Sequence, residues 1–211
     1  MKDNVETLQK NYTNFLEAIK KSFDGERLEK LLHMYSEDEL GMNIMISPAT
    51  SNSNYFNAYE GGYIEHVMNV ARNSLRQLKV YEESGVEIDF TKEELLFSAF
   101  HHDLGKVGVK GKLNFIPNDS EWHIKTLGQV YKLNDELDYM TYLDRTYYLL
   151  QHYGLKMTEK EMLGIRLTNG LFDEDNKKYL KNNNPQFEQK TPMYHILHSA
   201  EIMSTFIQKN T

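Results

Sequence analysis

The chain alternates between stretches in which apolar residues recur at helical spacing and short polar breaks. Residues 4–23 place apolar side chains three and four positions apart, which predicts an amphipathic helix. Asp24-Gly25 ends this pattern, and a second helical pattern runs over 26–35. The segment 46–62 is rich in Pro, Ser, Asn and Gly, so we expect a loop there. The buried face of the first helix should carry Val5, Leu8, Tyr12, Phe15, Leu16 and Ile19.

The rest of the chain predicts more helices and few strands. Residues 63–83 have a second apolar face, made of Ile64, Val67, Met68, Ala71, Leu75 and Leu78. Thr91 and Glu94 have the spacing of a capping box, which predicts that a helix begins there and continues to His102. We expect an irregular segment at 105–119 with a short hairpin near 112–116, and a polar connection with a helical turn at 173–190. Further helices are predicted at 120–133, 141–152, 158–169 and 191–208, with Trp122 in the core. The predicted fold class is all-α.

Composition narrows the classes of function. The chain has 211 residues, enough for one domain, and no apolar run long enough to span a membrane. It has no cysteine, which excludes disulfides, a thiolate nucleophile and a cysteine zinc site. The N-terminal residues lack the apolar stretch of a secretory signal, so we expect a cytoplasmic protein. The net charge of -7 argues against non-specific nucleic-acid binding, which needs a broad basic surface.

Three separate segments offer metal ligands. His66 lies in one predicted helix, His102 and Asp103 end another, and Glu201 lies in an otherwise apolar C-terminal helix. Buried polar groups are costly unless they have partners, and a metal ion would supply one. Two imidazoles with two carboxylates suit a divalent Mn, Fe, Co, Ni or Mg ion. They differ from structural zinc sites, which are rich in sulfur ligands. The alternatives are that His66 is a core or capping histidine and that His102 and Asp103 are the polar C-terminal end of a helix. A neighbouring helical residue points about 100° away, so we expect His101 to pack elsewhere.

The sequence motifs around these residues resemble those of the HD-domain metal-dependent phosphohydrolases. "GGYIEH" resembles the family's "GG-x-x-EH", and "HHDLGK" resembles "HD-x-GK". "HSAEIMS" resembles "H-x-AD-x-x-S", with Glu201 where the family has Asp. The lead-in "SPATSNSNYFNAYEGG" is similar to that of small bacterial and phage members. The resemblance covers about 46–207. It implies an HD-type helical bundle over 41–211, preceded by two extra helices in an extension over 1–40.

The resemblance also implies roles for single residues. His66, His102, Asp103 and Glu201 would hold the metal ion, Asp103 would also orient or deprotonate water, and Lys106 would offset phosphate charge. Phe56 and Thr168 stand where some members carry further histidines. His123 and His152 are therefore candidates for a second metal or a phosphate.

Other polar residues are candidates for substrate contacts. Asn69 and Asn73 share a helix face with His66. Lys106, Lys110 and Lys112 form a basic segment, called here the basic lip, that could attract a phosphate. His195 and His198 share a helix face with Glu201. Three interpretations are open: a separate metal site, support of Glu201, or an ordinary surface position.

Several functions fit this pattern. The first is hydrolysis of a phosphoester or phosphoanhydride in a small-molecule nucleotide. A 3'→5' exonuclease or phosphodiesterase acting on oligonucleotides is an alternative. Others are a catalytically degenerate HD protein that binds a nucleotide for regulation, and a helical interaction module without a metal. Residues 1–40 either cap the domain or form a homodimer interface.

Overall fold

The long helices form where the apolar spacing predicts them. The computed structural model describes residues 2–181, 184, 186 and 188–209. Most of these residues are helical, which confirms the predicted class apart from one small sheet. The long helices are α1 (Lys2–Ser22), α2 (Gly25–Met34), α4 (Gly62–Glu83), α5 (Lys92–His101), α7 (Tyr142–His152), α8 (Glu159–Leu167) and α10 (Met193–Lys209). Among these described helices, none is long and apolar enough to cross a membrane.

Short elements connect the long helices. Two of them, η1 (Glu37–Gly41) and α3 (Met42–Ile46), were not predicted. The 3-10 turn η2 (Leu104–Val107) follows α5 directly. The helical turn expected in 173–190 is confirmed by η4 (Glu174–Asn176) and α9 (Lys177–Leu180), which come after η3 (Gly170–Phe172).

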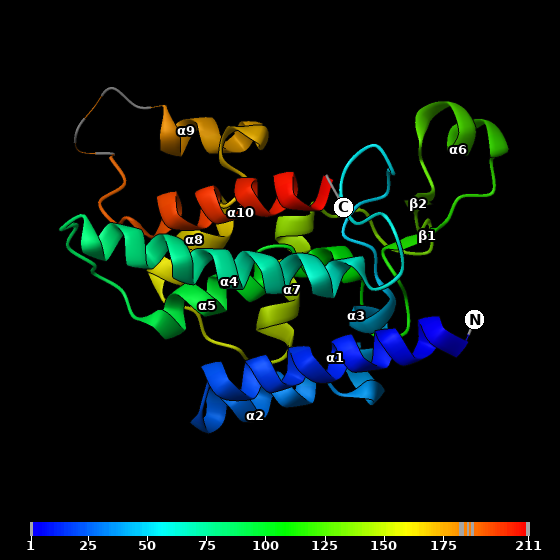
Figure 1. Cartoon of the computed structure of the whole chain (residues 1–211), viewed down its shortest axis with the longest axis horizontal. Helices are drawn as coiled ribbons and strands as arrows, with labels where there is room; N and C mark the ends of the chain where they lie inside the picture. Colours follow the sequence, from blue (N-terminus) through cyan, green and yellow to red (C-terminus); the bar gives the residue numbers. More distant parts are fainter. Residues whose placement is uncertain (1, 182–183, 185, 187, 210–211) are drawn as a thin grey trace.

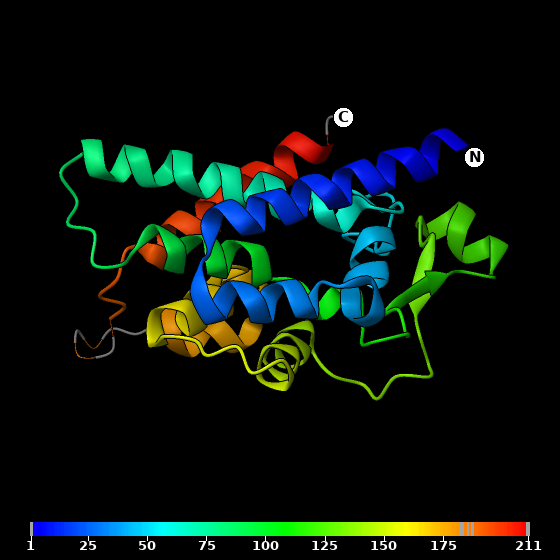
Figure 2. The ribbon, with the colours of Figure 1, turned by 90° about the horizontal axis from the view of Figure 1, so that it is seen from below.

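The helices are arranged in layers around one core. Figure 1 shows α10 above α4, with α8 partly behind them, α5 below α4, and α1 and α2 at the opposite side. Helix α4 packs on α10, α5, α3 and α1, and α8 packs on α5 and α10. Figure 2 shows the same bundle from below, with the hairpin region at one end. This arrangement brings segments that are distant in sequence to the middle of the bundle.

Helices α1 and α2 of the predicted N-terminal extension pack against the rest of the described chain. Phe15 and Ile19 of α1 are completely buried in the same apolar cluster as residues of α4 and α5. Arg27 of α2 donates to both carboxylate oxygens of Glu161 in α8, at 2.6 and 3.1 Å. Its guanidinium also lies 4.5 Å from the ring centre of Phe97. The extension is therefore joined to the bundle by both apolar and ionic contacts.

The helix predicted over 120–133 is wrong in its second half. Helix α6 (Glu121–Leu127) ends at Gly128, whose φ of 69° is the left-handed conformation that glycine adopts at low cost. The chain then enters strand β2 (Tyr131–Leu133), antiparallel to β1 (Phe115–Pro117). The hairpin near 112–116 is displaced, since the tight bridge joins Val109 to Lys112. Helix α6 projects from the bundle (Figure 1), so Trp122 is 60% exposed and not in the core as predicted.

Candidate metal centre

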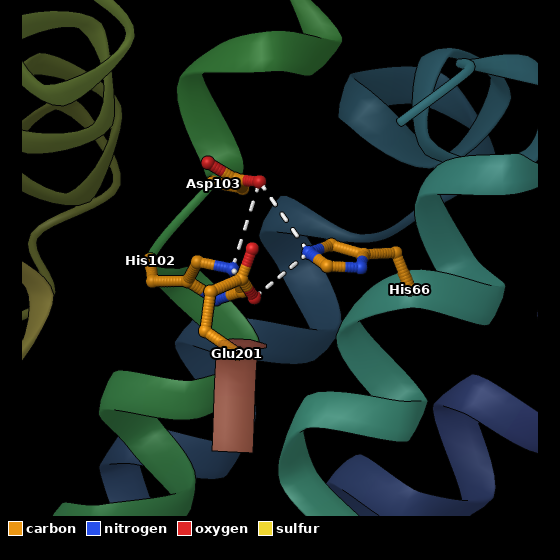
Figure 3. A group of neighbouring side chains, drawn as sticks. All are labelled: His66, His102, Asp103 and Glu201. Carbon is orange, nitrogen blue, oxygen red and sulfur yellow. Dashed lines mark ion pairs between the residues drawn. The ribbon is translucent and has the colours of Figure 1, made fainter. Parts of the chain in front are cut away.

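Four side chains from three parts of the fold converge in the middle of the bundle (Figure 3). His66 comes from α4, His102 and Asp103 follow α5, and Glu201 comes from α10. Glu201 Oε2 lies 3.0 Å from Nε2 of His66 and 3.3 Å from Nε2 of His102. Asp103 Oδ2 lies 3.7 and 3.5 Å from the same two nitrogens. One ligand atom from each residue fits within 4.8 Å of all the others, and all four residues are buried.

Both histidines are oriented by a hydrogen bond from the far side of the ring. Nδ1 of His66 lies 2.9 Å from Oε1 of Gln208, and Nδ1 of His102 lies 2.8 Å from the carbonyl oxygen of Ala99. Because both partners are acceptors, each Nδ1 carries a hydrogen, so in the neutral ring each Nε2 presents a lone pair to the cluster. This is the tautomer that binds a metal through Nε2. The sequence analysis missed Gln208, although it lies seven residues after Glu201 and so near the same helix face.

Three atoms of the cluster lack hydrogen-bond partners among the described residues. They are Nε2 of His66, Nε2 of His102 and Oε2 of Glu201, all inaccessible to water. An unmade hydrogen bond at a buried polar atom costs roughly 1–3 kcal/mol, and here three acceptors face one another. A divalent cation bound between them removes this cost, and two nitrogens with carboxylate oxygens suit a divalent ion such as Mn, Fe, Co, Ni or Mg. The residues therefore fit a metal ion.

The charges around the cluster keep both carboxylates ionised. Burial raises the pKa of Asp103, but the Lys106 ammonium and the charge of His102 when protonated together outweigh it, so the pKa lies below its usual value. Burial also raises the pKa of Glu201, yet the positive charge that His66 and His102 carry when protonated brings it well below the usual range. Ionised carboxylates are the form that binds a cation.

Lys106 lies at the edge of the cluster. Its Nζ is 2.6 Å from Oδ2 of Asp103 and 5.8 Å from the ring centres of Phe56 and Tyr142. Burial lowers the pKa of Lys106, but the Asp103 carboxylate more than compensates, so the ammonium stays charged. A Cβ on Gly105 would collide with the carbonyl oxygen of Tyr142, so glycine allows this segment to pack closely on α7.

A pocket of about 340 Å³ opens beside Glu201 and Lys106. Phe56 and Thr168, the two positions where the resemblance expects histidines, both line it. Tyr55 and Phe172 add aromatic surface, and Asn169, His198, Ile202, Thr205, Lys209 and Thr50 complete the wall. The ring of Phe56 also lies against His66, with 4.6 Å between ring centres. The pocket thus borders the cluster and offers both stacking surface and polar groups.

The candidate substrate residues on α4 and in the basic lip have other partners. Asn73 donates to the Ser204 hydroxyl at 2.9 Å, and Asn69 accepts from Arg72 at 2.6 Å. Lys110 pairs with Glu39 at 2.7 Å, and Lys112 lies 3.6 Å from a carboxylate oxygen of Glu136. None of these four candidates lines the pocket beside Glu201.

The remaining histidines lie outside the four-residue cluster. His123 is on α6, with Nδ1 2.6 Å from the Ser120 hydroxyl, and His152 is exposed at the end of α7 against two tyrosine rings. His195 is exposed, whereas His198 donates from Nδ1 to the Thr168 carbonyl at 2.7 Å.

His101 packs away from the cluster, which confirms its predicted role. Its Nδ1 donates to the Phe97 carbonyl, and its Nε2 accepts from the Tyr35 hydroxyl, both at 2.6 Å. Complete burial lowers the pKa of His101 to about 3, so the ring is neutral at physiological pH.

Comparisons of the chain with protein-family models, with curated proteins and with solved structures gave no match.

Proposed function

We propose that this protein is a metal-dependent phosphohydrolase of the HD type that cleaves a phosphoester or phosphoanhydride bond of a nucleotide. One observation carries the proposal. Two imidazole nitrogens and a carboxylate oxygen are buried without hydrogen-bond partners, next to an ionised aspartate and a pocket. Such a set is costly to keep unless a cation is bound to it.

His66, His102, Asp103 and Glu201 would hold the ion. When bound, the ion supplies a Lewis acid that polarises a phosphate oxygen and lowers the pKa of water. Asp103 would orient the attacking water by accepting a hydrogen bond from it, or take its proton. Lys106 borders the pocket and stabilises the charge that grows on the phosphate in the transition state.

The pocket walls support a nucleotide as the substrate. Tyr55, Phe56 and Phe172 offer ring faces on which a base can stack, and Thr168 and Asn169 offer hydrogen-bonding groups. A volume of about 340 Å³ falls at the small end of the usual range for small-molecule sites. This favours a mononucleotide over an oligonucleotide.

The test is an activity screen with metal-stripped protein. Mn, Mg, Co, Ni and Fe(II) are restored one at a time, and release of phosphate and nucleoside is measured on a panel of nucleotides and one short oligonucleotide. Asp103→Ala is compared with Asp175→Ala, a matched change at an exposed acid. We expect metal-dependent turnover that disappears in Asp103→Ala and persists in Asp175→Ala.

Other outcomes separate the alternatives. Turnover of the oligonucleotide alone would favour the exonuclease. Stoichiometric metal binding without turnover on any substrate would contradict the proposal and favour a regulatory nucleotide-binding protein. No metal binding at all would leave the helical interaction module.

A further inference from the structure

A second pocket lies where β2 and the following loop meet the start of α7. Its volume is about 400 Å³, and its lining shares no residue with the pocket beside Glu201. Its lining combines apolar and aromatic side chains with the polar side chains of Asn114 and Arg145. The apolar and aromatic residues of the lining are Leu133, Leu137, Tyr139, Met140 and Tyr142. The proposed hydrolysis makes no use of this pocket.

Arg145 is a buried cation without a carboxylate partner. The residue is only 4% exposed, and no acidic group of the described residues lies within ion-pair distance of it. Its guanidinium donates to the carbonyl oxygen of Asp138 at 2.7 Å, and its buried Nε has no hydrogen-bond partner. Burying an unpaired charge is expensive, and structures normally pair it. Arg145 is therefore in a state that an anion would stabilise.

A second donor lies in the same pocket. Asn114 is also 4% exposed, and its amide nitrogen is buried without a partner in the described part of the chain. The pocket wall also includes Thr141 and Tyr142, at the N-terminus of the eleven-residue helix α7, where the helix dipole is positive. Guanidinium and amide nitrogens only donate hydrogen bonds, so a ligand that binds them must offer acceptors. The positive charge of Arg145 favours acceptors that are negatively charged.

The acids at this pocket do not neutralise Arg145. Asp135 and Asp138 both line it, and both are exposed, so water screens their charge. The buried guanidinium is not screened in this way. The two carboxylates weaken the attraction for anions and disfavour ligands with several negative charges.

We propose that this pocket binds a small organic oxyanion. A carboxylate or phosphate group would pair with Arg145 and Asn114, and an apolar or aromatic body would lie against Tyr139 and Met140. Since the two pockets have separate linings, this site is distinct from the metal centre and independent of the proposed hydrolysis.

The test is calorimetric titration of the full chain with benzoate and with phenyl phosphate, using benzyl alcohol as the neutral control. We expect saturable binding of at least one oxyanion and none of the alcohol. Loss of a charge-assisted hydrogen bond in Arg145→Gln should weaken binding at least about tenfold. Asp138→Asn keeps the backbone carbonyl that Arg145 uses but removes the competing charge, so it should tighten binding roughly two- to fivefold.

Asp103→Asn identifies binding at the metal centre, because it alters that cluster and changes no residue that lines the second pocket. Oxyanion binding that survives Asp103→Asn and responds oppositely to Arg145→Gln and Asp138→Asn supports the proposal. Which of the two ligands binds tells whether the carboxylate or the phosphate is preferred. Absence of binding, loss of binding in Asp103→Asn, or no effect of Asp138→Asn would overturn the proposal even if Arg145→Gln proved unstable.

Discussion

Shortening Glu201 by one methylene tests whether its carboxylate is a metal ligand. Its Oε2 lies 3.0 and 3.3 Å from Nε2 of His66 and His102. Helix α10 is held against α4 by packing and by the hydrogen bond from Asn73 to Ser204. Because the helix is held in place, Glu201→Asp withdraws the carboxylate by about 1.5 Å, one carbon–carbon bond length.

This withdrawal is large compared with what a metal site tolerates. Metal–ligand distances vary by only about 0.2 Å, so the shortened side chain would lose contact with the ion. Removing a group that merely orients a ligand costs roughly 10–100-fold in metal affinity. Loss of the ligand itself should therefore cost at least about 100-fold, or about 2.8 kcal/mol.

The assay is titration with Mn²⁺, followed by the electron paramagnetic resonance signal of the free ion. Glu201→Asp is compared with Glu201→Gln, which keeps the length but removes the charge, and with Met203→Ala, a change at an exposed position of the same helix. We expect both Glu201 variants to bind Mn²⁺ weakly and Met203→Ala to bind like the wild type. Wild-type affinity in both Glu201 variants would show that the reasoning is wrong.

Three further predictions follow from the contacts described above. Gln208→Met removes the acceptor that orients His66 and should weaken Mn²⁺ binding roughly 10–100-fold in the same titration. Arg27→Met leaves the fully buried carboxylate of Glu161 unpaired and should lower the free energy of unfolding by about 3–5 kcal/mol in urea denaturation. The double variant Arg27→Met/Glu161→Leu should recover much of that loss, and a double variant as unstable as the single one would contradict this explanation. The pKa of His101 falls from 6.5 to about 3 in the folded protein, so between these values the unfolded state binds one more proton and stability declines as the pH falls. From pH 7 to pH 5 the wild type should therefore lose about 2 kcal/mol more than His101→Gln, and equal losses in urea denaturation would refute this.

The helices could be predicted because their signals are local. The capping box of Thr91 and Glu94 forms as expected, with both hydrogen bonds in place. The errors concern which apolar residues of a helix become buried, because that depends on how the helices pack. Leu75 continues the apolar spacing of α4 but is 38% exposed, and Val5 on α1 is 53% exposed. Apolar spacing shows that one face of a helix is apolar, but it cannot show how far the neighbouring helices extend over that face.

The four candidate ligands could be predicted as a set, but their surroundings could not. The sequence placed His66, His102, Asp103 and Glu201 in separate segments, and the fold brings them within 4.8 Å of one another. The ion pair of Lys106 with Asp103 depends on side-chain geometry that spacing does not determine. The same is true of Gln208, whose contact with His66 spans 142 residues.

The pairing of α4 with α10 also has a consequence for the order of folding. Joining residues 142 positions apart requires closure of a long loop, and the entropy lost in that closure is recovered only after the helices pack. During synthesis, the side of α4 that carries His66 is made long before α10 and stays uncovered until that helix arrives. Fast local contacts, such as those within the α1–α2 pair, can form first, whereas assembly of the metal ligands belongs to a late step. Metal added to a refolding chain should then slow unfolding more than it speeds folding.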